Sequence, residues 1–312
     1  MGVGSEGIRS VIDLGTNTVL MVTGRRRTDG SVEVLDDAHA IARLGQGVDA
    51  GRRILPEAME RVCGFIEGYR DRAHALGAAS IRAYGTSALR DAVNKEEFIA
   101  HVRSRVGIEL RELPGSEEAR LTFIGAAFGL SLPPRYGVID IGGGSTELAL
   151  GAGSEVEKSA SVDMGAVRLT ERHFPHLPPT PDQLKAAGEA IENSLDQFFP
   201  FPSDVSLVGV AGTVTTLGAI DKGIERFDAD ALNGHFLKIS RIAALTSRLL
   251  SLPHGEIRSI PQIGEQRADI ISAGALILLL ALQKWKCPGL YVSTRGIRYG
   301  LLMRELESCN LP

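Results

Sequence analysis

The stretch Asp140-Ile-Gly-Gly-Gly-Ser-Thr-Glu147 decides how the rest of the chain is interpreted. It begins at the end of an apolar run, Tyr136 to Ile141, that predicts a buried strand. Consecutive glycines after a strand let the backbone approach a ligand closely and direct successive N–H groups at an anion. A glycine-rich hairpin turn without a ligand is the alternative. The added hydroxyls favour a phosphate-binding loop made of Gly142, Gly143, Gly144, Ser145 and Thr146.

Two carboxylates flank this loop, Asp140 on the strand side and Glu147 on the far side. Mg²⁺ prefers oxygen ligands and usually shares them between protein carboxylates and the phosphates of a substrate. We therefore predict that Asp140 and Glu147 hold Mg²⁺ or another divalent cation, either directly or through water molecules.

The N-terminal half opens with a matching stretch, Asp13-Leu-Gly-Thr-Asn-Thr18, directly after an apolar strand. In both halves two further strands follow, and helices then alternate with strands. This repeat predicts two duplicated α/β domains, residues 1–132 and 133–312, with a cleft between them. Ligands of such folds bind at the C-terminal ends of the strands.

Two other loops follow apolar strands and are candidates for phosphate binding. The first comprises Gly15, Thr16, Asn17 and Thr18, for which an Asx-type turn is the alternative. The second is Gly209-Val-Ala-Gly212-Thr213-Val-Thr-Thr216, which is predicted to open a helix. Free N–H groups at a helix N-terminus attract phosphate, so Gly212 and Thr213 are predicted to bind it. Helix N-capping by Thr213 is the alternative.

A helix is also predicted to begin at Pro114-Gly-Ser-Glu117-Glu118. The pattern alone favours a structural role, because Ser116 suits an N-cap and the helix dipole stabilises acids in a first turn. The location after a strand adds a functional interpretation. Hydrolysis of a phosphoanhydride needs a carboxylate that orients or deprotonates water, and Glu118 is the candidate.

Two arginines, Arg90 and Arg267, follow the predicted ends of secondary-structure elements. The guanidinium group grips phosphate oxygens as a bidentate fork, so both are predicted to bind substrate phosphates. A solvated or ion-paired surface arginine is the alternative for each.

The bulk composition limits the class of protein. The chain has 312 residues, 44% of them hydrophobic and 23% charged, which fits a globular protein with a proper core. The net charge of −4 does not point to a nucleic acid, so local groups must hold any anionic substrate. We expect no membrane partner and a cytoplasmic protein, because the three cysteines are scattered and the apolar run Ala273 to Leu282 fits a buried helix. The sequence carries no interface signature, and a homodimer stays open.

Together these motifs resemble those of the exopolyphosphatase/guanosine pentaphosphate phosphohydrolase (Ppx/GppA) family, over about residues 8 to 305. Asp140–Glu147 is a full match to the second phosphate motif of the family. Asp13–Thr18 matches the first, with threonine where serine is more usual. Further segments that resemble family signatures are Thr86–Arg90, Gly115–Arg120, Gln266–Ile271 and Val292–Arg298.

The resemblance implies the actin/Hsp70/sugar-kinase (ASKHA) fold, built from two ribonuclease-H-like domains. It implies metal-assisted hydrolysis of the terminal phosphate of inorganic polyphosphate or guanosine pentaphosphate. It places water activation on Glu118, phosphate binding on Arg90, and metal binding on Asp140 and Glu147. An ATP-dependent actin-like protein or sugar kinase, and a non-catalytic sensor of polyphosphate or alarmone, are the alternatives. A water-activating Glu118 argues against the kinase.

Two features depart from the family pattern. Tyr299 stands where the last signature usually has glutamate, so a carboxylate role there is in doubt. The sequence ends at Pro312, whereas longer members carry a further helical HD-type domain that lengthens the substrate channel. The resemblance is therefore to the short form, and the preferred polyphosphate length stays open.

Overall fold

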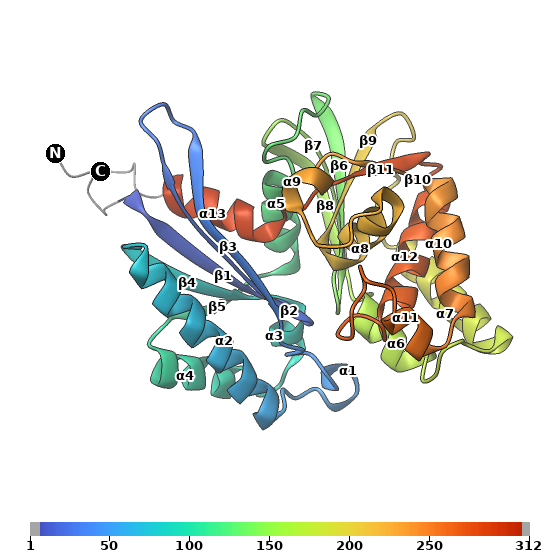
Figure 1. Ribbon diagram of the computed structural model, residues 1–312, viewed down its shortest axis with the longest axis horizontal. Coiled ribbons are helices and arrows are strands. Elements are labelled where there is room, and N and C mark those ends of the chain that lie inside the picture. The colour runs from blue at the N-terminus through green and yellow to red at the C-terminus, as the bar shows by residue number, and fades with distance from the viewer. Residues whose placement is uncertain (1–6, 308–312) are drawn as a thin grey trace. The chain divides into compact units, whose positions relative to one another are not determined.

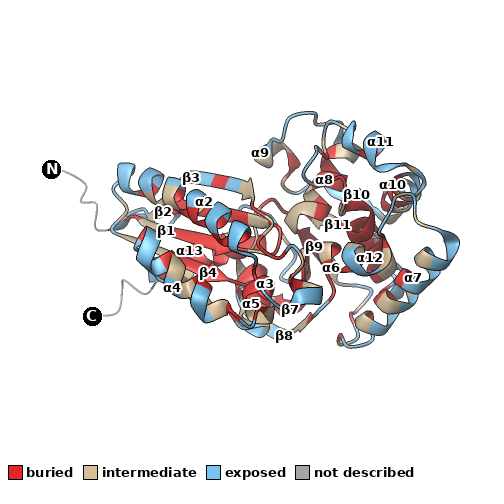
Figure 2. Ribbon diagram, turned by 90° about the horizontal axis from the view of Figure 1, so that it is seen from below, coloured by how far each residue is buried: buried red, intermediate tan, exposed pale blue. Residues whose placement is uncertain are grey.

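The structure is a computed structural model that describes residues 7–307 (Figure 1). The chain divides into two compact units. One consists of the described residues up to Leu121 together with those from Ile297 onward, and the other is Thr122–Gly296. Each unit contains one mixed β-sheet, and the central strands of both sheets are largely buried (Figure 2).

The sheet of the first unit comprises β1 (Arg9–Leu14), β2 (Thr18–Arg26), β3 (Val32–Ile41), β4 (Ser80–Gly85) and β5 (Leu110–Glu112). Its strand order is β3-β2-β1-β4-β5. The first three strands are antiparallel neighbours, whereas β1, β4 and β5 run parallel. The parallel pairing brings the C-terminal ends of β1, β4 and β5 to one edge of the sheet, where the predicted loops begin.

Helices cover both faces of this sheet. They are α1 (Val48–Gly51), α2 (Pro56–Ala75), α3 (Ser87–Asp91), α4 (Lys95–Val106), the first part of α5 (Gly115–Ala126) and α13 (Ile297–Glu307). Ile12 and Leu14 of β1 join one apolar core with the buried faces of α2 and α4. Alternate strand residues point to the opposite face, where α13 packs against β1 and β2.

The sheet of the second unit comprises β6 (Arg135–Ile141), β7 (Thr146–Ala152), β8 (Glu155–Val162), β9 (Ser206–Val210), β10 (Phe236–Lys238) and β11 (Gly289–Val292). Its strand order is β10-β11-β9-β6-β7-β8. As in the first unit, an antiparallel meander, β6-β7-β8, is followed by parallel neighbours, β9 and β11. The predicted duplication is confirmed, and the two sheets have the strand order of the ASKHA fold class.

The helices of the second unit are α6 (Ala166–His173), α7 (Pro181–Leu195), α8 (Ala211–Lys222), α9 (Ala229–Leu232), α10 (Ile239–Ser251), α11 (His254–Arg258) and α12 (Ile271–Lys284). Most of them build one large core on one face of the sheet. Phe123 and Ala126 of α5 cover the other face, where the Phe123 ring stacks on Tyr136.

The apolar run Ala273 to Leu282 lies within α12, as predicted, and is buried because α12 packs against α6, α7, α8 and α10. Within the described residues, none of the helices combines the length and the apolar character that crossing a bilayer requires.

The compact units differ from the predicted domains, 1–132 and 133–312, at two places. The second half of α5, from Thr122, belongs to the second unit. Helix α13 belongs to the first unit, because its apolar residues pack on β1 and β2. The boundary at 132 and 133 follows the repeated motifs, and it stays a proposal for where one duplicated segment ends and the next begins.

We expect Gly300→Ala to lower the free energy of unfolding by about 1–3 kcal/mol, because it overpacks the contact between α13 and α5. A Cβ at Gly300 would lie 2.0 Å from the carbonyl oxygen of Leu121. Gly188→Ala, in α7, is the matched control, since no atom lies within 4 Å of its added Cβ. It should stabilise the protein by about 0.5–1 kcal/mol through helix propensity. Urea unfolding of both variants measures the difference, and equal effects would contradict the packing argument.

Candidate functional site

The glycine loop after β6 turns its carbonyl groups toward helix α6. The first three N–H groups of α6 donate to the carbonyl oxygens of Gly142 and Gly143, at 2.8–3.1 Å. Arg168 Nε donates to the carbonyl oxygen of Gly144 at 2.8 Å. In a trans peptide the N–H group points away from the carbonyl of the preceding residue. The N–H groups of Gly143, Gly144 and Ser145 therefore point away from α6, as an anion cradle requires.

Two residues that support this loop were missed from the sequence. A Cβ at Gly165 would lie 2.4 Å from the carbonyl carbon and oxygen of Gly143, so only glycine fits between loop and helix. Arg168 is 6% exposed and fixes the last glycine carbonyl. An arginine in the first turn of a buried helix was the available signal, but its partner could not be known without the fold.

The loop after β1 has the same geometry as the loop after β6. Gly15 N–H donates to the carbonyl oxygen of Thr18 at 2.8 Å, just as Gly142 N–H donates to that of Ser145 at 3.0 Å. N–H groups of the segment 42–45 donate to the carbonyl oxygens of Thr16 and Asn17 at 2.8–3.0 Å. The duplication therefore extends from the strand order to the hydrogen bonds of the two predicted phosphate loops.

Helix α8 begins directly at the end of β9, with Val210 as its N-cap and no side-chain cap. The alternative in which Thr213 is the N-cap is wrong, because Thr213 lies within the first turn of α8. Ala211 has a φ of 68°, a left-handed conformation that disfavours residues other than glycine. Backbone strain of this kind concentrates at ligand sites. Here the left-handed Ala211 bends the chain so that the first turn of α8 follows β9 directly.

Arg267 lies against the start of α8. A Cβ at Gly212 would be only 1.4 Å from Arg267 Nη1, so the guanidinium occupies the space that this glycine leaves. Among the described residues no carboxylate pairs with it, and burial lowers the pKa of the Arg267 guanidinium. A half-buried arginine beside the N–H groups of a helix start is a combination suited to an anion.

Glu118 lies in the first turn of α5, where it is 7% exposed. Arg90 Nη1 donates to Glu118 Oε2 at 2.6 Å and to the carbonyl oxygen of Leu113 at 2.9 Å. Burial raises the pKa of the Glu118 carboxyl, and the adjacent Arg90 opposes that rise. Ser116 is not an N-cap, since α5 already begins at Gly115. Arg90 therefore contacts the candidate base directly, which its sequence position did not indicate.

Asp140 and Glu147 are directly opposite one another on the antiparallel strands β6 and β7. Opposed residues on neighbouring strands project from the same face of the sheet, with Cβ atoms about 4.5–5.5 Å apart. Glu147 is 2% exposed, and Ser161 Oγ donates to its Oε1 at 2.7 Å. The described residues contain no group of three or more His, Cys, Asp or Glu side chains that could hold a metal. A pair of carboxylates that shares a cation with substrate oxygens and water still suits Mg²⁺.

Two residues singled out in the sequence make structural bonds. The Thr146 hydroxyl donates to the carbonyl oxygen of Met164, so a phosphate contact by this hydroxyl would have to replace that bond. Tyr299, at the position of the family glutamate, is 4% exposed and donates to Asp37 Oδ2 at 2.6 Å. Arg298 pairs with the same carboxylate, so Tyr299 ties α13 to β3.

Within each unit the predicted residues gather at the C-terminal ends of parallel strands. In the first unit, Thr86 N–H donates to the carbonyl oxygen of Leu14 at 3.2 Å, and Leu113 N–H to that of Gly85 at 2.9 Å. These bonds join the ends of β1, β4 and β5, from which Gly15–Thr18, Arg90 and Glu118 follow. In the second unit the loop after β6 and the start of α8 after β9 are neighbours in the same way.

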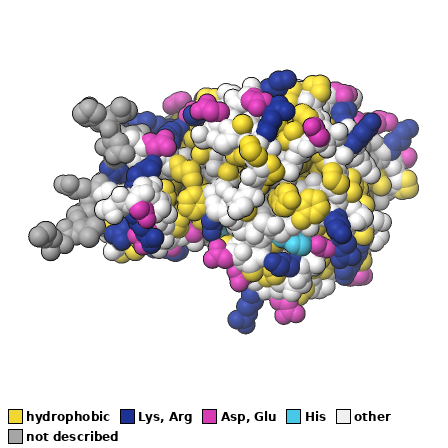
Figure 3. Space-filling model, turned by 90° about the horizontal axis from the view of Figure 1, so that it is seen from above, with side chains coloured by type: hydrophobic (Ala, Val, Ile, Leu, Met, Phe, Trp, Pro, Cys, Tyr) yellow, Lys and Arg dark blue, Asp and Glu magenta, His cyan; other side chains and the backbone are white. Residues whose placement is uncertain are grey.

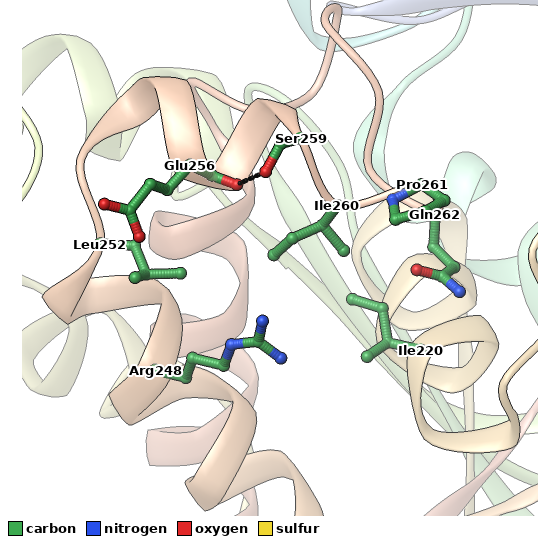
Figure 4. Close-up of a pocket in the computed structure, with 8 residues that line it drawn as sticks. All are labelled: Ile220, Arg248, Leu252, Glu256, Ser259, Ile260, Pro261 and Gln262. Atoms are coloured by element: carbon green, nitrogen blue, oxygen red, sulfur yellow. Dashed lines mark hydrogen bonds between the residues drawn. The ribbon is translucent and has the colours of Figure 1, made fainter.

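A pocket of about 340 Å³ in the second unit contains none of these residues (Figure 4). Ile220, at the C-terminal end of α8, Arg248 and Ile260 are among the residues that line it. Ile220 is eight residues from Gly212, or about 12 Å along the helix axis. The pocket is therefore separate from the candidate phosphate-binding positions.

The face of the molecule shown in Figure 3 carries interspersed basic and acidic side chains, in keeping with the small net charge of −4. Such a surface provides little long-range attraction for an anion. Phosphate binding therefore depends on local groups, namely the loop amides and the individual arginines.

The fold defines an α/β protein of the ASKHA class with candidate phosphate-binding loops, and comparisons with known proteins narrow this class to a family. A profile of the Ppx/GppA phosphatase family matches residues 25–309. Exopolyphosphatase 2 of Mycobacterium tuberculosis is 34% identical over 281 residues, 86% of this chain and 88% of that protein. The crystal structure of the Aquifex aeolicus Ppx/GppA family member is 29% identical, with a TM-score of 0.84 over 98% of this chain and 99% of that one.

The chain belongs to the Ppx/GppA phosphatase family. A guanosine-5'-triphosphate,3'-diphosphate pyrophosphatase of Vibrio atlanticus is also similar, at 28% identity over 306 residues. This match covers 97% of the present chain but 60% of the Vibrio protein.

We expect Gly212→Ala to weaken the binding of tripolyphosphate at least about tenfold. The new methyl group would displace the Arg267 guanidinium, which would then lose the charge-assisted hydrogen bonds that we predict it makes to a phosphate. The fold should persist, since the displaced group is the far end of a flexible side chain. Isothermal titration calorimetry measures the affinity, and thermal unfolding measures the stability. Gly218→Ala, in the same helix, is the control, because its Cβ meets only apolar side chains of Val292 and Leu232. Unchanged affinity in Gly212→Ala would contradict the role of Arg267.

Proposed function

We propose that the protein is an exopolyphosphatase that hydrolyses the terminal phosphoanhydride bond of inorganic polyphosphate. The observation that carries this proposal is the buried Glu118 carboxylate, which lies 2.6 Å from Arg90. Both residues lie in helices that directly follow parallel strands, β5 and β4. A carboxyl group whose pKa is raised by burial is a better proton acceptor than an exposed one. The relatives that are named exopolyphosphatases, at 34% and 27% identity, support the choice of substrate.

In the proposed reaction, Glu118 accepts a proton from a water molecule while the water oxygen attacks the terminal phosphorus atom. The bond between that phosphorus and the bridging oxygen breaks. Orthophosphate and a chain shorter by one phosphate are the products. Arg90 keeps the Glu118 carboxylate oriented through its hydrogen bond, and the proposal also assigns this guanidinium a contact with a substrate phosphate.

The backbone carries much of the proposed phosphate binding. The N–H groups of Gly143, Gly144 and Ser145 face away from α6, and those of the first turn of α8 have no side-chain cap. Fixed N–H groups need no reorganisation when charge develops on a phosphoryl group. Arg267 adds a positive charge at the start of α8. The proposal assigns further contacts to the loop Gly15–Thr18.

Asp140 and Glu147 would hold Mg²⁺, because they present hard oxygen ligands from opposed strand positions. When bound, the cation neutralises charge on the phosphate oxygens and polarises the phosphoryl group. Ser161 Oγ donates to Glu147 Oε1 and thereby orients this carboxylate. Hydrogen bonds of this kind to a ligating carboxylate tune its orientation and its affinity for the metal.

A second candidate substrate is guanosine pentaphosphate, whose 5′-terminal phosphate is held by the same type of bond. The similarity to the Vibrio guanosine-5'-triphosphate,3'-diphosphate pyrophosphatase favours it. The catalytic groups proposed here serve both substrates, so only turnover measurements separate them. A protein that binds these polyanions without turnover is the remaining alternative.

We expect Glu118→Gln to lower kcat for long-chain polyphosphate by a factor of about 10²–10⁴, the usual contribution of a general base. Orthophosphate release is measured with polyphosphate, guanosine pentaphosphate and ATP in parallel. Glu109→Gln is the control, because Glu109 precedes β5 and only loses an exposed pair with Arg111.

Each result of that experiment has a definite meaning. Release from polyphosphate that is lost in Glu118→Gln supports the proposal. Release only from guanosine pentaphosphate would identify this second candidate as the substrate. Binding without release from any substrate leaves the non-catalytic alternative, and normal turnover in Glu118→Gln removes the assigned role.

We expect chelation of divalent cations by EDTA to abolish turnover and added Mg²⁺ to restore it. Asp140→Asn and Glu147→Gln should each weaken Mg²⁺ binding by a factor of at least about ten, because each removes one charged ligand. Calorimetric titration with Mg²⁺ measures this without reference to activity. Glu157→Gln, which only loses an exposed pair with Arg135, is the control. Unaltered Mg²⁺ affinity in both variants would exclude this pair as the metal site.

A further inference from the structure

Helix α13 brings a second arginine to the first turn of α5. Arg304 Nη1 donates to Glu117 Oε1, one residue before the proposed base. The two adjacent acids thus have separate arginine partners from different elements, since Arg90 of α3 binds Glu118. The side chains of Arg304 and Glu117 are 28% and 40% exposed, so their ion pair by itself contributes little to stability.

Arg304 is itself held in place by a buried network. Its guanidinium lies over the Tyr84 ring, 4.8 Å from the centroid. The Tyr84 hydroxyl donates to Glu305 Oε1 at 2.6 Å, and Arg82 pairs with Glu305 at 3.1 Å. Tyr84 and Glu305 are 2% and 5% exposed. A guanidinium that is stacked and flanked in this way has few rotamers available, so it holds Glu117 at a defined position.

The backbones of α13 and α5 also approach closely. A Cβ at Gly300 would lie 2.0 Å from the carbonyl oxygen of Leu121. Leu121 lies in α5, just after the turn that carries Glu117 and Glu118. The position of α13 and that of α5 are therefore coupled, and the Arg304 pair extends this coupling to the first turn.

The two acids point in different directions from the first turn of α5. Neighbouring residues of an α-helix lie about 100° apart around its axis, so Glu117 and Glu118 do not face each other. Arg304 therefore holds this turn from α13, while Arg90 holds it from α3.

We propose that Arg304 is a positioning residue for the reaction: by holding Glu117 it fixes the first turn of α5 and keeps Arg90 paired with Glu118. This inference rests on the proposed role of Glu118. Arg304 contacts no reacting atom in this scheme and acts only through α5.

The test compares Arg304→Met, Arg304→Lys, Glu117→Gln and the double variant Arg304→Met/Glu117→Gln, with polyphosphate and Mg²⁺. We expect Arg304→Met to lower kcat about tenfold, with KM changed less than about twofold, because a small misplacement of a catalytic group affects the chemical step. Arg304→Lys, which restores the charge but not the planar stack on Tyr84, should recover only part of the loss. The double variant should be no slower than Arg304→Met, since both changes break one interaction.

Arg82→Met is the matched control, because it removes another arginine of the same network that pairs with Glu305 and not with α5. It should lower the unfolding temperature at least as much as Arg304→Met and leave kcat within about twofold of the wild type. Equal losses of kcat in Arg82→Met and Arg304→Met would overturn the inference, as would additive losses in the double variant.

Glu118→Gln is measured alongside, so that the two proposals can fail separately. If Glu118→Gln is inactive and Arg304→Met is normal, only the positioning role is wrong. If Glu118→Gln is fully active, the assignment of the base is wrong and the positioning role falls with it.

Discussion

The candidate phosphate-binding site depends on the direction in which the carbonyl groups of the loop after β6 point. Backbone N–H groups at the start of α6 and the buried Arg168 bind the carbonyl oxygens of Gly142, Gly143 and Gly144. Because peptide groups are planar and trans, fixing the carbonyls also fixes the direction of the loop N–H groups. The geometry of the proposed anion cradle is thus a consequence of these hydrogen bonds with α6, and Gly165 leaves the space in which the loop and the helix meet.

The arginines of the site differ in what they bind. Arg90 is paired with Glu118, and Arg304 with Glu117, so these two set the charge and orientation of the acids. Arg267 has no carboxylate partner among the described residues and lies against the uncapped start of α8. A buried cation without a counter-charge is costly unless a ligand supplies one. This contrast separates residues that organise the proposed base from one that is available for a substrate phosphate.

Much of the fold was predictable because its signals are local. The apolar run Tyr136 to Ile141 predicted the strand that the structure shows as β6, Arg135–Ile141, and the repeated strand-Asp-x-Gly stretch predicted the duplication. The shortest elements, such as α9 and β10, were not predicted, because three or four residues carry no period. Ser116 and Thr213 looked like N-caps, yet both helices begin earlier, since tertiary packing and not capping fixes their first turns.

By itself the sequence determined the residue types of the candidate site, the class of fold and the membership of the Ppx/GppA phosphatase family. It could do so because glycines, acids and hydroxyls at fixed spacing after a strand are local information. Only the tertiary structure decided which groups are partners. The contacts of Glu118 with Arg90 and of Glu117 with Arg304 span 28 and 187 residues of chain. The place of α13 in the first unit also depends on distant segments of the chain. The same holds for the contact of Arg267 with Gly212. Such contacts arise from the packing of whole elements, and no local pattern encodes them.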